Sequence, residues 1–291
     1  MSRRNAFSDC HPVVNLLYFG SVLAFTMFTL HPLCLTISLL GALCCAACVK
    51  GRETRALCLS ILPIVLLAAF FNPLFNHEGM TLLLYLPSGN PLTLESIAFG
   101  LSAAAMLAAA VLWFSCCSAV ITSDKFLYLF GRIAPALSLL LSMTLRFVPL
   151  FIGQLKTVTQ ARKGLYAGAA PSKGFARAKL AIASLSSVTT WALEHAVETA
   201  DSMKSRGYGL PGRTAFSLYR LDRRDKALLA WLSFCGLYVL SGCLAGGMAW
   251  RYYPTMKGVS PTPLAASFFF VYLLLCLTPL FLELWERRLF S

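Results

Sequence analysis

Long apolar runs dominate this sequence and constrain its fold more than any other feature. An α-helix needs roughly 20 residues to cross the ~30 Å hydrocarbon core of a bilayer. Six runs approach or exceed that length, at residues 13–30, 32–49, 56–75, 94–122, 227–250 and 264–284. With 58% hydrophobic and only 13% charged residues, the 291-residue chain has too little polar surface for a soluble fold. The sequence therefore predicts an all-α integral membrane protein with about six transmembrane helices.

The distribution of basic residues predicts the orientation of these helices. Lys and Arg are enriched in cytoplasmic loops of membrane proteins. They occur at the N-terminus and in residues 50–55 and 123–132, whereas residues 76–93 contain none. This pattern predicts cytoplasmic termini and places residues 76–93 outside. The first apolar run lacks a small-residue cleavage site after it, so we expect no removed signal peptide.

Residues 153–226 form a basic block between the fourth and fifth apolar runs. They hold 13 of the 25 Lys and Arg residues, against five acidic residues. A net charge of +13 could indicate nucleic-acid binding, but the charges lie beside membrane spans, so orientation in a lipid bilayer explains them and no nucleic-acid partner is expected. We predict membrane helices in residues 1–122, a cytoplasmic domain of amphipathic helices in residues 123–226, and further membrane helices in residues 227–291.

Residues 133–152 are apolar enough for a seventh span, but other features oppose one. If they crossed the bilayer, the basic block would lie outside, opposite the other basic loops. Arg146 near the middle would also cost about 2.5–3.5 kcal/mol at the centre of a membrane helix, and Pro135 and Pro149 would favour kinks. We therefore predict a long helix on the cytoplasmic membrane surface that continues to Arg162.

A second surface helix is predicted over residues 181–205. Its apolar positions are interrupted by Glu194, His195 and Glu198, which makes it amphipathic and too polar to span. These polar groups could indicate an acid–base site, but no opposing nucleophile is visible, so a solvated helix face is the preferred interpretation. Glycines and a proline in residues 164–179 predict a connecting loop. A shorter helix is expected before both, with Ser123 as its N-cap.

The composition gives no indication of a resident metal or cofactor. Ten of the 11 cysteines lie in or beside apolar runs, which is typical of Cys acting as a small hydrophobic residue. Cys44, Cys45 and Cys48 have a spacing that could bind metal, yet no second Cys pair or nearby His completes a four-ligand set. No phosphate-binding glycine-rich loop ending in Lys-Ser or Lys-Thr occurs, so we expect no ATP hydrolysis by this chain.

Both predicted surface helices end in an arginine followed closely by a glycine. Arg162 precedes Gly164, and Arg206 precedes Gly207. Cations favour the negative end of the helix dipole and glycine favours the left-handed cap position, so one such end is ordinary. Two on adjacent amphipathic helices are more informative, because a guanidinium at a helix tip can enter a groove on another protein and pair with a carboxylate.

These residues resemble the transmembrane T component of energy-coupling factor transporters, including their cobalt-transport relatives. The second end, Ala-Asp-Ser-Met-Lys-Ser-Arg-Gly-Tyr-Gly at residues 200–209, is similar to the family's acid-x-Met-x-x-Arg-Gly-Tyr-Gly stretch, with Ser205 where Ala is usual. The first end is looser, because Lys163 stands where Gly is usual and Gly164 follows it. Residues 146–150 also resemble the family's Arg-Phe-x-Pro segment. The specific resemblance covers residues 124–214.

This resemblance implies a non-catalytic coupling subunit in the plasma membrane of a prokaryote. Such a subunit acts with two cytoplasmic ATPases and a separate substrate-binding membrane subunit, the S component, in ATP-driven uptake of a vitamin or metal ion. The residues expected to bind the ATPases are Ala161, Arg162, Lys163, Gly164, Ser205, Arg206 and Gly207. The apolar face expected to bind the substrate subunit consists of Leu137, Leu140, Leu141, Thr144, Leu145 and Val148.

Three alternatives remain at this point. The apolar face could instead pack on the chain's own spans. A self-contained secondary permease would carry ionisable residues inside its spans, but Glu95 and Glu283 lie only at span ends. A membrane-bound enzyme could use the basic block to act on anionic lipid headgroups.

Overall fold

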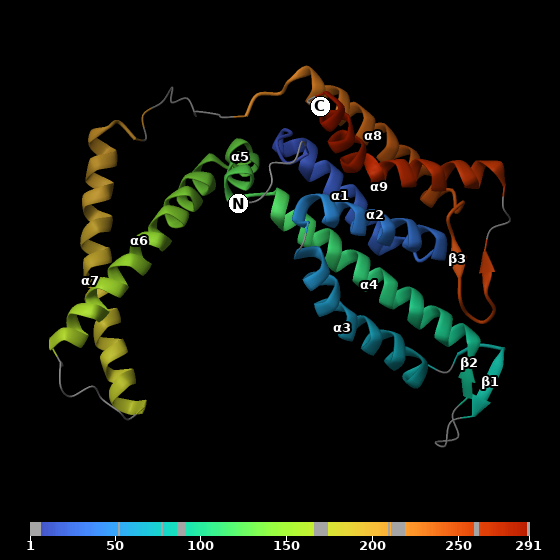
Figure 1. Ribbon diagram of the computed structural model, residues 1–291. Helices are drawn as coiled ribbons and strands as arrows, with labels where there is room; N and C mark the ends of the chain where they lie inside the picture. Colours follow the sequence, from blue (N-terminus) through green and yellow to red (C-terminus); the bar gives the residue numbers. More distant parts are fainter. Residues whose placement is uncertain are drawn as a thin grey trace. The chain divides into compact units, whose positions relative to one another are not determined.

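The computed structural model describes residues 7–51, 53–76, 78–85, 91–165, 174–208, 210, 219–258 and 262–289. These residues are almost entirely α-helical, as predicted (Figure 1). They form two compact units. Unit 1 consists of Met1–Phe126 and Tyr219–Ser291, and unit 2 consists of Leu127–Leu218.

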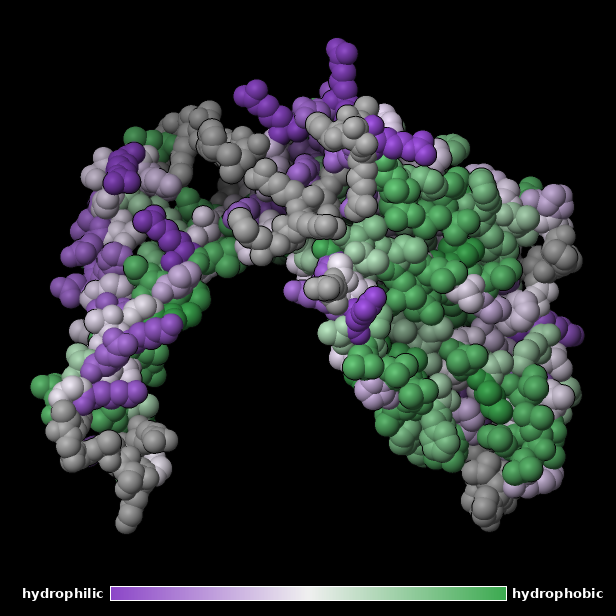
Figure 2. Space-filling view, in the orientation of Figure 1, coloured by the Kyte–Doolittle hydropathy of each residue, from purple (hydrophilic) through white to green (hydrophobic). Residues whose placement is uncertain are grey.

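Unit 1 is a bundle of hydrophobic helices. Its elements are α1 (Pro12–Phe28), α2 (Pro32–Lys50), α3 (Glu53–Phe75), α4 (Leu94–Val120), the start of α5 (Ser123–Ile133), α8 (Arg223–Leu244) and α9 (Pro263–Leu289). Hydrophobic residues cover most of the visible face of this unit in Figure 2. Unit 2 contains the rest of α5, α6 (Pro135–Leu165) and α7 (Gly174–Ser205).

Six helices in the described ranges are long and apolar enough to cross a membrane, which agrees with the predicted number. They are α2, α3, α4, α6, α8 and α9. The set differs from the predicted one in two members. Helix α1 has 17 residues and is therefore short for a span, whereas α6 passes by length and hydropathy alone. Because these two criteria ignore the charge of the flanking loops, the surface position of α6 stays a prediction.

His-Pro pairs start the first two helices. The Nδ1 atom of His11 accepts the backbone N–H of Val13 at 3.3 Å, and Nδ1 of His31 accepts that of Leu33 at 3.2 Å. The proline that follows each histidine occupies the first helical position, where no N–H is needed. The pairs fix the starts of α1 and α2, and the second pair also lies at the short connection between them.

The core of unit 1 is aromatic with a small polar network inside it. Trp113 of α4, Tyr18 of α1 and Tyr272 of α9 are fully buried. The Thr26 and Ser38 hydroxyls lie 2.6 Å apart, and the Trp113 indole N–H donates to Ser38 Oγ at 3.0 Å. Such buried polar groups are tolerated because each has a partner, and they link α1, α2 and α4.

Two short hairpins, not predicted from the sequence, lie in the longer connections. Strand β1 (Leu82–Tyr85) pairs antiparallel with β2 (Pro91–Thr93), and β3 (Trp250–Arg251) pairs with β4 (Lys257–Gly258). The two connections touch each other, since Met80 N donates to Pro254 O at 3.2 Å. The loops after α3 and after α8 therefore share one end of unit 1.

The N-terminal segment and the starts of α5 and α8 share the other end of unit 1. Lys125 of α5 donates to the Ser8 carbonyl, and the His11 backbone N–H donates to Asp225 of α8 at 3.4 Å. Lys50 at the end of α2 donates to Ser115 near the end of α4 at 2.6 Å. This grouping of loops agrees with the predicted sidedness. Which end faces the cytoplasm stays a prediction from charge.

Candidate functional site

Unit 2 is built around two long helices, α6 and α7, that cross each other (Figure 1). Aromatic rings fill the crossing. The Phe151 ring meets the Trp191 ring edge-on at 5.8 Å between centroids, and the His195 ring stacks on Trp191 at 5.2 Å. Ser184 and Val188 of the same helix α7 are buried. Edge-to-face and stacked rings at these distances hold a helix pair in a defined geometry.

The predicted long helix ending near Arg162 is confirmed, because α6 runs without interruption from Pro135 to Leu165. The predicted connecting loop over residues 164–179 is too long. Helix α7 begins at Gly174, since the following residues continue its helical pattern, and residues 166–173 lie outside the described part of the chain. Ser123 is likewise the first residue of α5 rather than its cap.

The end of α7 at Arg206 is a specific cap motif. Gly207 has φ +77°, its N–H donates to the Lys204 carbonyl at 3.0 Å, and the Tyr208 N–H donates to the Met203 carbonyl at 3.1 Å. These two bonds define a Schellman motif with glycine in the left-handed position, as predicted. Arg206 is the last residue before the glycine and is exposed. Its guanidinium is thus presented to solvent at a rigid helix end.

The end of α6 near Arg162 differs from that prediction. Gly164 lies inside the helix with no positive φ, because α6 continues to Leu165 instead of ending in a glycine cap. Arg162 is half-buried, and its Nη2 donates to Ser187 Oγ of α7 at 2.7 Å. Ala161, Lys163 and Gly164 are exposed around it. Arg162 therefore joins the two helices as well as standing near a helix end.

The structure does not bring the two arginines together. Arg162 contacts α7 at Ser187, whereas Arg206 lies 19 residues further along the same helix. At 1.5 Å per residue this corresponds to roughly 28 Å along α7. Figure 1 shows the C-terminal ends of α6 and α7 at opposite ends of the crossed pair. Arg162 and Arg206 therefore lie in separate parts of unit 2.

The predicted apolar face on the first half of α6 is open. Leu137, Leu140 and Val148 are 64%, 61% and 54% exposed. Thr144 and Leu145 are exposed and Leu141 is half-buried. Five of these six residues precede Phe147, whose ring contacts His195 of α7, and Val148 follows it. A contiguous apolar surface of this kind needs a partner protein or lipid to cover it.

The polar residues of α7 that could have indicated an acid–base site either pack against α6 or face solvent. His195 lies 3.8 Å from Glu198, whose side chain is 73% exposed, and also contacts Phe147. Within the described ranges, no group of three His, Cys, Asp or Glu side chains is arranged to hold a metal ion. All 11 cysteines are free thiols, and most are buried or half-buried among the helices.

A buried polar cluster within unit 1 was not predicted from the sequence. Lys125 and Asp225 are 6% and 7% exposed, and Asn15, with its amide oriented to satisfy both neighbours, accepts from Lys125 Nζ at 2.8 Å and donates to the Phe7 carbonyl at 3.0 Å. Burial lowers the pKa of the Lys125 ammonium and that of the His11 imidazole. Only a weak indication of this cluster is present in the sequence, because each of these polar residues stands alone near the end of a predicted membrane helix.

Comparison with known families identifies the class of protein. The family CbiQ, described as cobalt transport protein, matches residues 4–216. The chain belongs to this family. The match extends beyond the residues that carried the sequence resemblance and includes α1 through α7, so the membrane helices and the crossed pair both lie within it. No curated protein matches the chain.

Membership in the CbiQ family makes this chain a multi-pass membrane component of cobalt or energy-coupling factor transport, a T component. The family is one of transporter components that are typically non-catalytic. Helices α8 and α9 follow the matched range.

Proposed function

We propose that this chain couples two cytoplasmic ATPases to a substrate-binding membrane subunit, the S component, in uptake of a vitamin or metal ion. The observation that carries the proposal is the placement of Arg206 and Arg162 on one crossed helix pair, roughly 28 Å apart along α7. An exposed guanidinium on a capped helix end suits a groove lined by carboxylates. Arg162 is half-buried against Ser187 near the end of α6, so only Arg206 has this exposed, capped geometry. The separation of the two positions suits two ATPases, one for each arginine.

The aromatic crossing between α6 and α7 can transmit movement. Each helix is continuous over more than 30 residues and therefore acts as a stiff lever about the contact of Phe151 with Trp191. Partners that hold the two helix ends and move closer together would change the crossing angle. The first half of α6, with its exposed Leu137, Leu140 and Val148, would then shift its apolar face.

The apolar face of α6 is the proposed contact with the substrate-binding subunit. Together with Leu141, Thr144 and Leu145, these residues supply hydrophobic area without a charged side chain, as a neighbour within the membrane boundary requires. In this proposal residues 123–226 and both termini are cytoplasmic, which follows from the positive-inside bias. ATP is hydrolysed by the partners.

Charge reversal at both arginines tests the proposal. We expect Arg162→Glu with Arg206→Glu to abolish uptake and to prevent co-purification of two ATPase subunits with the tagged chain, since each carboxylate partner would face a like charge. The matched control is Lys156→Glu with Lys179→Glu, which changes the net charge equally at exposed positions of α6 and α7. Normal uptake and ATPase recovery in the arginine double variant would contradict the proposal.

A further inference from the structure

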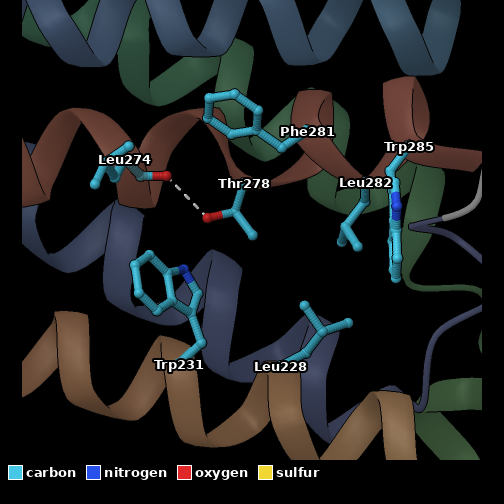
Figure 3. Close-up of a pocket in the computed structure, with 7 residues that line it drawn as sticks. All are labelled: Leu228, Trp231, Leu274, Thr278, Phe281, Leu282 and Trp285. Atoms are coloured by element: carbon cyan, nitrogen blue, oxygen red, sulfur yellow. Dashed lines mark hydrogen bonds between the residues drawn. The ribbon is translucent and has the colours of Figure 1, made fainter.

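Helices α8 and α9 enclose a groove that the coupling mechanism does not use. Its volume is about 420 Å³, and it lies between Leu228 and Trp231 of α8 and residues 274–285 of α9 (Figure 3). This volume falls within the range of roughly 300–1,000 Å³ that is typical of small-molecule sites. The groove belongs entirely to unit 1.

Helices α8 and α9 pack closely near Gly242 and are further apart toward the start of α8, where the groove lies. Gly242 of α8 lies against the ring of Phe268 of α9, so closely that a Cβ atom on the glycine would come within 2.6 Å of the ring. The Tyr238 and Ser267 hydroxyls are 2.8 Å apart in the same region. The groove begins beyond this contact, nearer the start of α8 and the end of α9.

The lining of the groove is apolar. Leu274, Phe281 and Leu282 supply the α9 side, and Thr278 directs its hydroxyl to the Leu274 carbonyl at 2.9 Å, so its hydrogen bond is already used (Figure 3). The remaining polar atoms are the indole N–H groups of Trp231 and Trp285, two residues that are 43% and 59% exposed as a whole. A hydrocarbon chain with hydrogen-bond acceptors near one end fits such a lining.

Charged side chains lie at the mouth of the groove. Arg224 is one turn before Leu228, and its Nη1 pairs with Glu286 Oε1 at 2.6 Å. Arg288 is exposed one turn beyond Trp285. Residues three or four apart share a helix face, so these groups and Asp225 lie near the groove. Arg224 and Glu286 neutralise each other, and Asp225 is buried and accepts the His11 backbone N–H, which leaves Arg288 as the exposed charge among these groups. The mouth therefore favours an anion.

We propose that this groove binds one anionic phospholipid, with an acyl chain along Trp231 and Phe281 and the phosphate near Arg288. Tryptophan is enriched where membrane helices meet the headgroup region, and basic pockets between membrane helices bind anionic headgroups. This end of unit 1 carries the loops with Lys50, Lys125 and Arg224, so by the positive-inside bias it faces the leaflet rich in anionic lipid. The site is independent of the coupling arginines.

The test is native mass spectrometry of the purified full chain titrated with phosphatidylglycerol or phosphatidylcholine. We expect one tight phosphatidylglycerol, bound about fivefold more weakly after Arg288→Gln, since a basic residue near a membrane surface contributes about 1 kcal/mol. Leu228→Trp should abolish the tight site by filling the groove. Arg223→Gln is the matched control, because it removes the same charge from another face of α8.

Fluorescence provides a second measurement that does not depend on the groove-filling variant. Phosphatidylglycerol with brominated acyl chains should quench the wild-type chain more strongly than it quenches Trp231→Phe, and more than brominated phosphatidylcholine does. Equal binding of the two lipids, or equal effects of Arg288→Gln and Arg223→Gln, would overturn the proposal in favour of ordinary boundary lipid. If Trp231 is no longer quenched by brominated lipid when the chain is in its transporter complex, the lipid proposal is overturned, and a partner protein occupies the groove instead.

Discussion

Arg206 and Arg162 occupy different environments although both are followed closely by a glycine. Arg206 is exposed before a glycine at φ +77°, in a cap closed by two backbone hydrogen bonds. Arg162 lies within a continuous helix and donates to Ser187. Gly207 is thus required by its backbone conformation, whereas Gly164 is an ordinary helical residue without Cβ neighbours within 4 Å.

The two glycines should respond oppositely to alanine. Gly207→Ala places a Cβ in the left-handed region, at a cost of about 1–2 kcal/mol, so the end of α7 should fray. Gly164→Ala should stabilise α6 by about 0.5–1 kcal/mol, because glycine is a poor helix former. Amide hydrogen exchange at residues 203–208 and 160–165 measures both effects. Similar protection changes at the two ends would contradict the assignment of their conformations.

At the scale of elements, the crossing of α6 and α7 is the main tertiary contact of unit 2 in the described part of the chain. Its rings come from Phe147 and Phe151 on one helix and Trp191 and His195 on the other. Periodicity predicted that both helices are amphipathic, but not which of their apolar positions meet. Leu193 and Val197 are as hydrophobic as the crossing residues and are 66% and 63% exposed.

Removal of the central ring should loosen the helix pair. We expect Trp191→Ala to destabilise unit 2 by about 2 kcal/mol, less than a fully buried tryptophan would, because the ring is only half-buried. Faster limited proteolysis between α6 and α7 and reduced uptake would report the change. Leu193→Ala, at an exposed position of the same helix, serves as the control and should change proteolysis little. Equal sensitivity of the two variants would show that the crossing does not hold the pair.

For the whole molecule, hydrogen bonds group the loops into two ends of unit 1. The connections after α3 and α8 meet through Met80 and Pro254, and the N-terminal segment meets the starts of α5 and α8 through Lys125 and Asp225. The positive-inside bias predicts that the second end faces the cytoplasm. Unit 2 follows Phe126 and precedes Tyr219 of unit 1 in the sequence. If α6 does not cross the membrane, unit 2 therefore lies on the same side of the membrane as the starts of α5 and α8.

Lysine labelling tests this sidedness. We expect a membrane-impermeant amine reagent to modify Lys204 and Lys179 in inside-out vesicles only, and Lys257 of β4 in right-side-out vesicles only. All three lysines are exposed, so access to each side chain depends on the side of the membrane. Modification of Lys204 from the outer side would mean that α6 spans the bilayer and that the charge argument fails for this segment.

The amino-acid sequence alone determined the helical membrane class and the number of long apolar helices, because hydropathy is a local property. It also predicted the left-handed Gly207, since a cap depends on neighbouring residues. Only the tertiary structure decided that Gly164 is helical, that Arg162 contacts Ser187 25 residues away, and that α8 and α9 separate beyond Gly242 to form a groove. These features depend on how side chains from distant segments pack, and no local pattern specifies that packing.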